Sequence, residues 1–268
     1  MRDELIKMFE KIVAKTITRE EGAMFLKDLL RRHDSKKIVS DIIGLIEKPT
    51  SFLYPTTVLH TVMLTRNPVF VDLFVYFLDS SSEAISIVST TGLVTIRTKD
   101  AQDALVKHLN NDNYHIRKSA AKALAEHFDM EGIRILENHA LSKRPYYYRL
   151  TTVAALMNGG NSGISVFFKL LYRGDTEVSN MVVEVVIEKS SAINDMHIEL
   201  FLNILKNAVE NHQDANVIVG ILTVFKALRE KIAEYTSIVQ ELKTSTNVCM
   251  KKAALEVFGA ETPLKQVS

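Results

Sequence analysis

Apolar residues recur at the spacing of an amphipathic helix along much of this chain, and short polar turns interrupt them at regular intervals. The clearest unit lies between residues 100 and 132. One apolar stripe consists of Ala101, Ala104, Leu105 and Leu109, and a second consists of Ile116, Ala120, Ala121 and Leu124. A polar turn at 110–113 separates them, and Asn113 is suited to cap the second helix. This pattern predicts two helices that pack as a pair.

The same arrangement repeats in both directions from Ile116. Apolar residues that follow a polar turn are Leu53, Ala84, Ile116, Tyr148, Val178, Val217 and Val248. Their spacings are 31, 32, 32, 30, 39 and 31 residues, and the longest leaves room for an insertion around residues 190–194. A register of this kind is typical of a repeat protein. It predicts an all-α solenoid, an α-α superhelix of about seven helical pairs.

Local signals add helix starts to this register. Thr18 with Glu21, and Ser80 with Glu83, both have the spacing of a capping box. The segment 85–91 is rich in β-branched residues and is compatible with a strand. The repeat register favours a helix there.

Composition supports a helical chain in one domain. Ten Gly and five Pro in 268 residues are few for an all-β protein. We expect a single domain over residues 1–268, in which 1–48 form an N-terminal cap or divergent repeat, 49–259 form the repeats and 260–268 form a tail. No run approaches 18 uncharged apolar residues, and the first residues do not resemble a signal peptide, which favours a cytoplasmic protein without a membrane span.

Charge and cysteine content narrow the chemistry. Lys and Arg number 33 against 32 Asp and Glu, and Trp is absent, which argues against a protein specialised for nucleic acid. Cys249 is the single cysteine, so neither an internal disulfide nor a Cys-rich metal site can form.

The unit around Ile116 resembles a HEAT repeat, in particular the short type of the phycobilin lyase-like proteins. Asp112 in the turn, the pair Ile116-Arg117 and the Ala-rich stretch 120–124 carry the resemblance. At the equivalent place Tyr148-Arg149 keeps the arginine, whereas the later units lose it. The resemblance implies helical pairs in a curved array with the second helices on the concave side. It also implies that Asp112 and Arg117 order the turn and pair with residues of adjacent repeats.

Catalytic motifs are missing from the sequence. Eight His residues, among them His108, His115, His127 and His139, raise the hypothesis of a metal site like that of the deoxyhypusine hydroxylases, which resemble HEAT proteins. Those enzymes use His-Glu pairs, and the chain contains no His-Glu dipeptide. It also lacks a phosphate-binding loop, a nucleophile elbow and a His-Glu-x-x-His motif. We therefore expect no catalytic residue, no metal and no cofactor.

The segment 143–149 combines three basic residues with three tyrosines. Tyr and Arg are frequent anchors of protein interfaces. The alternative is that Tyr148 packs in the core while its neighbours cover the start of a helix. Because one helix face cannot bury all three tyrosines, we expect at least one to be exposed.

Residues 49–96 are poor in charge, with Arg66, Asp72, Asp79 and Glu83 as their charged groups. Burial in the centre of the stack explains this composition. A homo-oligomer contact through residues 49–96 is the alternative, and large apolar surfaces of this kind are used in such contacts.

These observations favour a non-enzymatic protein–protein interaction module or scaffold that uses the concave face of its second helices. The partner-binding residues that we expect are Lys118, Lys122, Tyr146, Tyr147 and Arg149. Two alternatives stay open at this stage: a HEAT-like nucleic-acid-binding protein or DNA glycosylase, and a protein similar to the lyases that attach bilins or other prosthetic groups. The sequence does not identify the protein partner.

Overall fold

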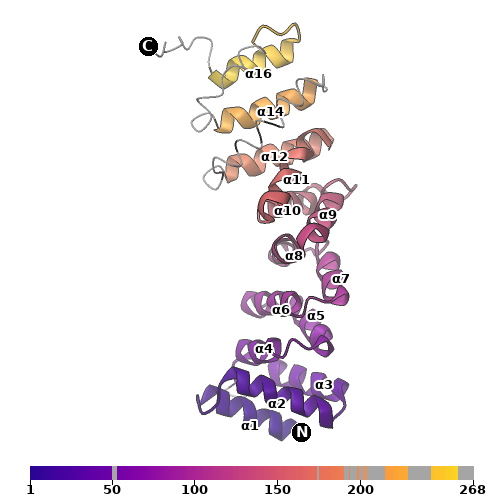
Figure 1. Cartoon of the computed structure of the whole chain (residues 1–268), viewed down its shortest axis with the longest axis vertical. Helices are drawn as coiled ribbons and strands as arrows, with labels where there is room; N and C mark the ends of the chain where they lie inside the picture. The colour runs from indigo at the N-terminus through magenta and orange to yellow at the C-terminus, as the bar shows by residue number, and fades with distance from the viewer. Residues whose placement is uncertain are drawn as a thin grey trace. The chain divides into compact units, whose positions relative to one another are not determined.

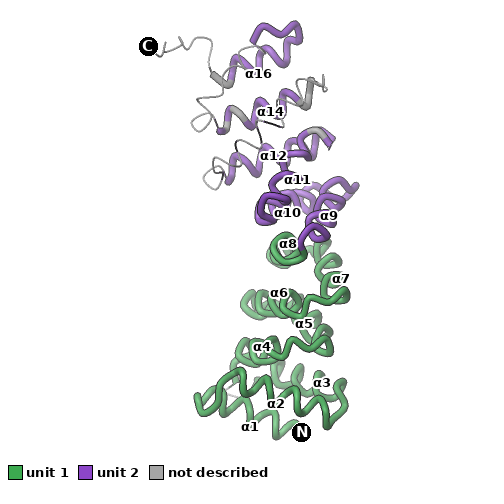
Figure 2. The backbone as a smooth tube through the Cα atoms, viewed as in Figure 1, with its two compact units in different colours: residues 1–128 green, residues 129–268 purple. Residues whose placement is uncertain are grey.

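The computed structural model describes residues 1–49, 53–173, 175–189, 193, 198, 201, 203, 215–228 and 243–258. Helices form the regular secondary structure, and no strand occurs among these residues. The chain divides into two compact units, residues 1–128 and 129–268 (Figures 1 and 2). Each unit is built from helices that follow one another as antiparallel neighbours in a stack.

Unit 1 consists of four helical pairs. Its helices are α1 (Arg2–Val13), α2 (Arg19–Arg32), α3 (Ser35–Glu47), α4 (Pro55–Met63), the 3-10 turn η1 (Pro68–Phe70), α5 (Val71–Leu78), α6 (Glu83–Ile96), α7 (Lys99–His108) and α8 (Tyr114–His127). The second helix of each pair packs against the next second helix, so that α2, α4, α6 and α8 form a continuous row.

Unit 2 continues the same plan within its own residues. Its described helices are α9 (Asp129–Ala140), α10 (Tyr146–Leu156), α11 (Gly160–Arg173), α12 (Thr176–Glu188), α14 (Ala215–Leu228) and α16 (Val248–Phe258). The second helices α10, α12, α14 and α16 pack against one another in order. The expected insertion at 190–194 lies outside the described residues except for residue 193, and the expected tail at 260–268 lies outside them entirely.

The repeat register is confirmed by the starts of the second helices. The second helices from α4 onward begin at residues 55, 83, 114, 146, 176, 215 and 248. Each start lies within two residues of the apolar position that the sequence register assigned to it. The prediction of an all-α repeat fold with about seven helical pairs is therefore confirmed. The single-domain boundaries stay a prediction.

One predicted capping box is present and the other is wrong. At the start of α2 the Glu21 amide donates to Thr18 Oγ1 at 3.1 Å, and the Thr18 amide donates to Glu21 Oε2 at 2.7 Å. At the start of α6, by contrast, Ser82 is the N-cap and makes no side-chain cap. Ser80 Oγ accepts the Ser82 amide at 3.2 Å, so this hydroxyl shapes the turn instead of capping the helix.

The β-branched segment 85–91 is helical, as the register predicted. Hydroxyls of α6 donate to carbonyls four residues earlier: Thr90 to Ser86 at 3.0 Å, and Thr91 to Ile87 at 2.9 Å. This arrangement satisfies the threonines inside a helix. Gly92 lets α6 approach α5 closely, because a Cβ there would lie 2.4 Å from the Phe74 ring. Packing against α4, α5 and α8 therefore outweighs the local strand propensity.

The charge-poor residues of 49–96 supply much of the core of unit 1. Phe70, Leu73, Phe74, Phe77 and Leu78 are buried. This agrees with the interpretation that these residues are apolar because they are buried in the stack. The homo-oligomer contact through residues 49–96 stays a prediction. No helix of the described part of the chain has the length and apolar character needed to cross a bilayer.

Candidate functional site

Equivalent positions of α6, α8, α10 and α12 define two kinds of site, one at a shared buried position and one next to it. The fourth residue of α6, α8, α10 and α12 is buried in each case; these are Ser86, Arg117, Arg149 and Ser179. The fifth and ninth residues lie about 100° and about 140° around the helix axis from the fourth, and we call them the outward row. In unit 1 they are Ile87 and Thr91 of α6 and Lys118 and Lys122 of α8, all exposed.

The α8 part of the outward row is basic and carries an aromatic ring. The Lys118 ammonium lies 5.7 Å from the centre of the Tyr114 ring, a cation–π contact at the start of the helix. Lys122 forms an ion pair of 3.7 Å with Glu126 on the same exposed face. Tyr114 is half exposed. This exposed face presents two cations and an aromatic ring that contact other residues of α8.

The outward row of unit 2 differs in character. Leu150 and Ala154 of α10 are half-buried, whereas Asn180 and Glu184 of α12 are exposed. The Tyr146 hydroxyl donates to Glu184 Oε2 at 2.5 Å and so connects α10 to α12. Burial, followed by this hydrogen bond to the Glu184 carboxylate, raises the pKa of Tyr146 to about 12. Tyr146 is therefore a neutral donor at physiological pH.

Tyr147 is the exposed member of the tyrosine cluster, with 71% of its surface accessible. Its ring contacts Tyr146 edge to face, with centroids 5.6 Å apart. Lys143 and Arg144 precede it in the exposed turn before α10, and Tyr148 is half-buried. The expectation that at least one of the three tyrosines is exposed is confirmed. An exposed tyrosine on a rigid helix start is the kind of residue that anchors protein interfaces.

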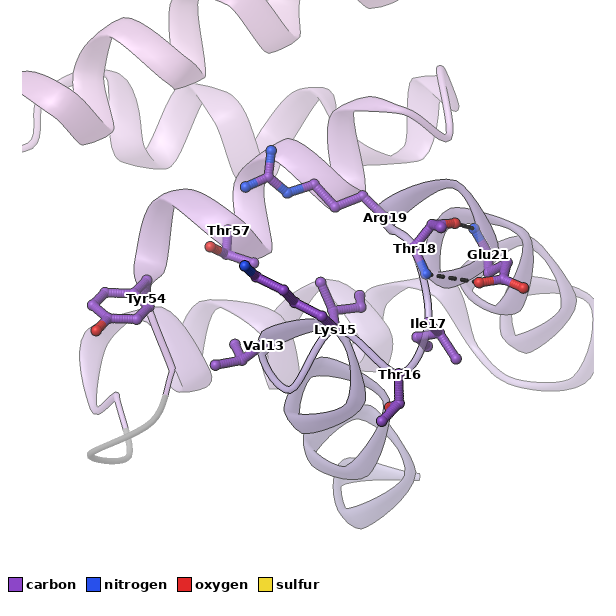
Figure 3. A pocket seen from close by; sticks show the side chains of 10 residues that line it. Val13, Lys15, Thr16, Ile17, Thr18, Arg19, Glu21, Tyr54 and Thr57 are labelled. Atoms are coloured by element: carbon purple, nitrogen blue, oxygen red, sulfur yellow. Dashed lines mark hydrogen bonds between the residues drawn. The ribbon is translucent and has the colours of Figure 1, made fainter.

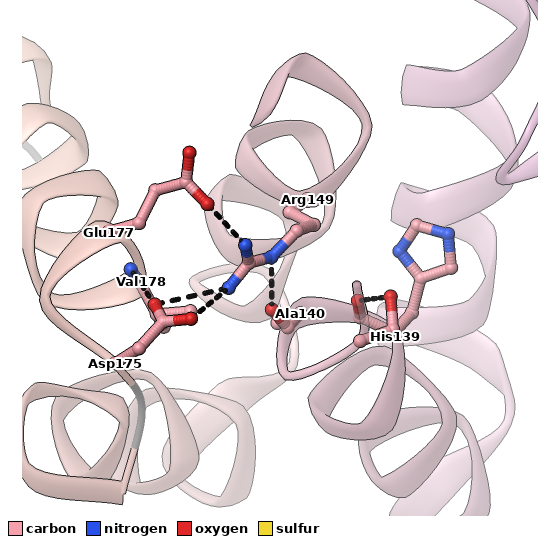
Figure 4. A network of polar contacts seen from close by, with 7 residues as sticks. His139, Ala140, Arg149, Asp175, Glu177 and Val178 are labelled. Carbon is pink, nitrogen blue, oxygen red and sulfur yellow. Dashed lines mark hydrogen bonds and ion pairs between the residues drawn. The ribbon is translucent and has the colours of Figure 1, made fainter. Parts of the chain in front are cut away.

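Arg149, an expected partner-binding residue, lies inside unit 2 with an exposed fraction of 3% (Figure 4). Its Nε donates to the Ala140 carbonyl at 2.8 Å, and its Nη1 donates to Glu177 Oε2 at 2.5 Å. Its Nη2 donates to Asp175, 3.3 Å from the nearer oxygen. Asp175 also caps α12 by accepting the Val178 amide at 2.9 Å. The guanidinium thus connects the end of α9 to the start of α12, and Arg149 is not part of the exposed surface.

Arg117 occupies the equivalent position in unit 1 and is also buried, with an exposed fraction of 6%. Its Nη1 donates to the carbonyls of Asn111 and Asp112 at 2.7 and 2.9 Å. These contacts order the turn before α8. They agree with the interpretation that the turn and its arginine are structural.

A second connection between repeats in unit 1 was not anticipated from the sequence. Asp79, which follows α5, accepts a hydrogen bond from Asn111 Nδ2 at 2.7 Å and lies 3.2 Å from His108 Nε2. Asn111 belongs to the turn of the following repeat. The repeat register could have indicated this contact, because Asp79 and Asn111 occupy corresponding turns 32 residues apart.

The histidines do not converge. His108 is buried and its Nδ1 lies 2.7 Å from the Ala104 carbonyl, while His115 and His127 are exposed on α8. His139 is half-buried beside Thr152, with 2.9 Å between Nδ1 and the hydroxyl oxygen. Burial, and then the charges of Arg144 and Arg149, lower the pKa of His139 to about 4. The described residues contain no group of three or more His, Cys, Asp or Glu placed to hold a metal ion.

The expected binding residues therefore fall into two groups. Lys118 and Lys122 lie together on α8 of unit 1. Tyr146 and Tyr147 lie together at the start of α10 of unit 2, with Arg149 beneath them in the interior. Each group is a surface of its own unit.

Comparison with known proteins gives the following similarities. Residues 71–157 match the family model for HEAT repeats. Human deoxyhypusine hydroxylase in complex with glycerol is 14% identical, with a TM-score of 0.34, over 85% of this chain and 98% of that one. Two engineered proteins are each 18% identical to this chain. The first has a TM-score of 0.31, and the match covers 82% of this chain and 67% of that one. The second has a TM-score of 0.24, and the match covers 90% of this chain and 95% of that one. No match was found among curated proteins.

The fold and the row of second helices define a helical-repeat protein. Within that class, the segment that contains α5 to α10 consists of HEAT repeats, as the match over residues 71–157 shows. The resemblance that Ile116 and Arg117 carried in the sequence is thus confirmed at the level of the HEAT repeat. The short phycobilin lyase-like subtype stays a prediction.

Proposed function

We propose that this chain is a non-enzymatic, cytoplasmic interaction module that binds a protein partner through the outward row of its second helices. The observation that carries the proposal is the contrast between adjacent positions on the same helix. The fourth residue of α8, Arg117, is buried and holds the turn, whereas the fifth and ninth residues, Lys118 and Lys122, are exposed. Helical repeats stack into extended surfaces of this kind, and HEAT repeats typically mediate protein interactions.

The start of α10 supports a second contact zone in unit 2. Tyr147 is largely exposed while Tyr146 is held by Glu184, so the exposed ring projects from an ordered neighbour. A side chain on an ordered element loses little conformational entropy when it binds. Lys143 and Arg144 add charge next to it.

Charge reversal on α8 tests the first zone. The Lys118→Glu/Lys122→Glu variant would be compared with Lys36→Glu/Lys37→Glu, which makes the same charge change on exposed residues of α3. Partners would be captured from native lysate and cross-linked, and the cross-linked residues mapped by mass spectrometry. We expect capture of the same partner to fall about tenfold for the α8 variant alone. Equal capture by both variants would contradict the placement on α8.

Tyr147→Ala tests the second zone, and Met130→Ala on α9 is its control because Met130 is also exposed in unit 2. A selective loss of capture for Tyr147→Ala is expected. The alternatives from the sequence are tested in the same preparation. Binding of duplex DNA at low salt, with a steep loss on adding salt, would favour nucleic-acid handling. A chromophore that absorbs visible light in the purified protein would favour the prosthetic-group lyases.

A further inference from the structure

A cavity of about 480 Å³ lies in unit 1 between the α1–α2 loop and the start of α4 (Figure 3). Ile12, Val13 and Ile17 give it an apolar wall. Its volume falls within the range of about 300–1,000 Å³ that is usual for small-molecule sites. The outward row of the second helices contributes none of these residues, so the cavity is separate from the proposed interaction surface.

Two cations stand at this cavity without a carboxylate partner. Lys15 and Arg19 both line it, and Figure 3 shows their side chains extending toward Tyr54 and Thr57 at the start of α4. Neither cation forms an ion pair within the described part of the chain. Glu21 also lines the cavity, but its carboxylate accepts the Thr18 amide at 2.7 Å in the capping box.

The loop that carries these cations is fixed at both ends. After α1, the Thr16 amide and hydroxyl both donate to the Lys11 carbonyl, at 2.9 and 3.0 Å. Lys15 has a φ of 57°, a left-handed conformation that reverses the chain at the helix end. The Thr18 capping box then starts α2. Lys15 therefore lies on an ordered loop and Arg19 is the first residue of α2, so the backbone that carries both cations is in place before any ligand arrives, which lowers the entropic cost of binding.

A neighbouring cavity shows why the charge of this one matters. It has a volume of about 410 Å³ on the other side of Ile17, and its charged residues are Glu4, Lys7, Lys11 and Glu21. Two carboxylates there balance two ammonium groups, so that cavity has no preference for an anion. The charged residues that line the first cavity are Lys15, Arg19 and a single carboxylate, Glu21, which accepts the Thr18 amide.

We propose that the cavity between the α1–α2 loop and α4 binds an amphipathic carboxylate. The carboxylate lies between Lys15 and Arg19, and the aliphatic or aromatic body lies against Ile12, Val13 and Ile17. Charge-assisted hydrogen bonds supply the selectivity for an anion. Burial of the apolar body supplies affinity in proportion to its area.

Octanoate is the probe that we would use, because it joins a carboxylate to an unbranched apolar chain. Titration of the full-length chain, followed by amide NMR shifts, should give saturable changes at residues 12–19 and at Tyr54 and Thr57. Octanol, which lacks the charge, and acetate, which lacks the chain, should each bind about tenfold more weakly. Equal binding of octanol would overturn the role of the cations, and equal binding of acetate would overturn the role of the apolar wall.

Paired variants separate the two cavities. Lys15→Gln/Arg19→Gln should weaken octanoate binding about tenfold, whereas Lys7→Gln/Lys11→Gln, which removes the same charge from the neighbouring cavity, should leave it unchanged. If Lys7→Gln/Lys11→Gln weakened binding and Lys15→Gln/Arg19→Gln did not, the ligand would lie in the neighbouring cavity and the proposal would be wrong. Lys15→Arg/Arg19→Lys keeps both charges and should retain binding. A folded charge-retaining variant that loses binding as completely as the Gln variant would also contradict the proposal.

Discussion

The repeat of α7 and α8 and the repeat of α9 and α10 carry the same residues at equivalent places and use them differently. His108 corresponds to His139, 31 residues on, and Arg117 corresponds to Arg149, 32 residues on. Arg117 donates to carbonyls of its own turn, whereas Arg149 donates to carboxylates of the following repeat. The inward direction of the arginine is thus a property of the repeat, but its partners depend on what the neighbouring turn supplies.

The histidines differ in the same way. His108 Nε2 faces the Asp79 carboxylate, while His139 lies near the positive charges of Arg144 and Arg149. A carboxylate thus lies beside the first ring, and two guanidinium groups lie near the second. One position in the repeat therefore has opposite electrostatic surroundings in the two units.

Replacing the two arginines should give the largest effects. We expect Arg149→Met to lower the free energy of unfolding by about 3 kcal/mol, which is near the low end of the cost of breaking a buried charge pair. The cost is at the low end because the Asp175 and Glu177 side chains are exposed and can be hydrated once the arginine is gone. Arg117→Met should cost about 2 kcal/mol, since it leaves two turn carbonyls without this donor. Urea unfolding of both variants measures the difference. An equal loss would show that the partners of the arginine do not matter.

The direction of Arg149 marks the limit of what the sequence revealed. Apolar spacing and polar turns are local signals, and they placed the start of each second helix from α4 onward to within two residues. That Arg149 contacts acids 26 and 28 residues away is a fact that no local pattern reports. The register did contain a clue, because Arg117 and Arg149 each follow an anchor residue directly. The exposure of Lys118, Lys122 and Tyr147 needed no such distant partner, and it followed from helix geometry.

Acid should destabilise the fold through His139. The folded pKa of His139 is about 4, below its ordinary value of 6.5, so between these values the unfolded chain binds a proton that the folded chain does not. This contribution to stability is complete above pH 6.5 and is lost as the pH falls toward 4. We expect the loss to be about 2 kcal/mol, after a discount for the exposed part of the ring.

The measurement is the difference in urea stability between pH 7 and pH 4.5. The His139→Asn variant should lose less stability over this range than the unaltered chain, because Asn does not titrate. The His108→Asn variant retains His139 and should keep that part of the acid sensitivity. If His139→Asn left the acid sensitivity unchanged, burial and the charges of Arg144 and Arg149 would not lower the pKa of this ring as the structure indicates.

Ser86 extends the comparison to the fourth residue of α6. Its hydroxyl is buried and donates to the Leu78 carbonyl at 2.8 Å, which connects α6 to the end of α5. We expect Ser86→Ala to lower the free energy of unfolding by about 1 kcal/mol, the usual net value of one such hydrogen bond. Thr91→Ala, on the exposed side of the same helix, is the control and should change stability less. A stabilisation by Ser86→Ala as large as that by Thr91→Ala would show that helix propensity, and not the inward contact, determines the result.

Ser179, the fourth residue of α12, should give the smallest effect and the opposite sign. Its hydroxyl is buried and has no hydrogen-bond partner in the described structure, although it occupies the place that Arg149 fills one repeat earlier. A buried hydroxyl without a partner is destabilising, and Ala is a better helix former than Ser. We therefore expect Ser179→Ala to raise the free energy of unfolding by about 0.5 to 1 kcal/mol. Thermal unfolding of Ser86→Ala and Ser179→Ala side by side would decide whether the side chain at the fourth position stabilises the repeat only where it has a hydrogen-bond partner. A loss of stability in both variants would mean that the hydroxyl stabilises this position with or without a partner.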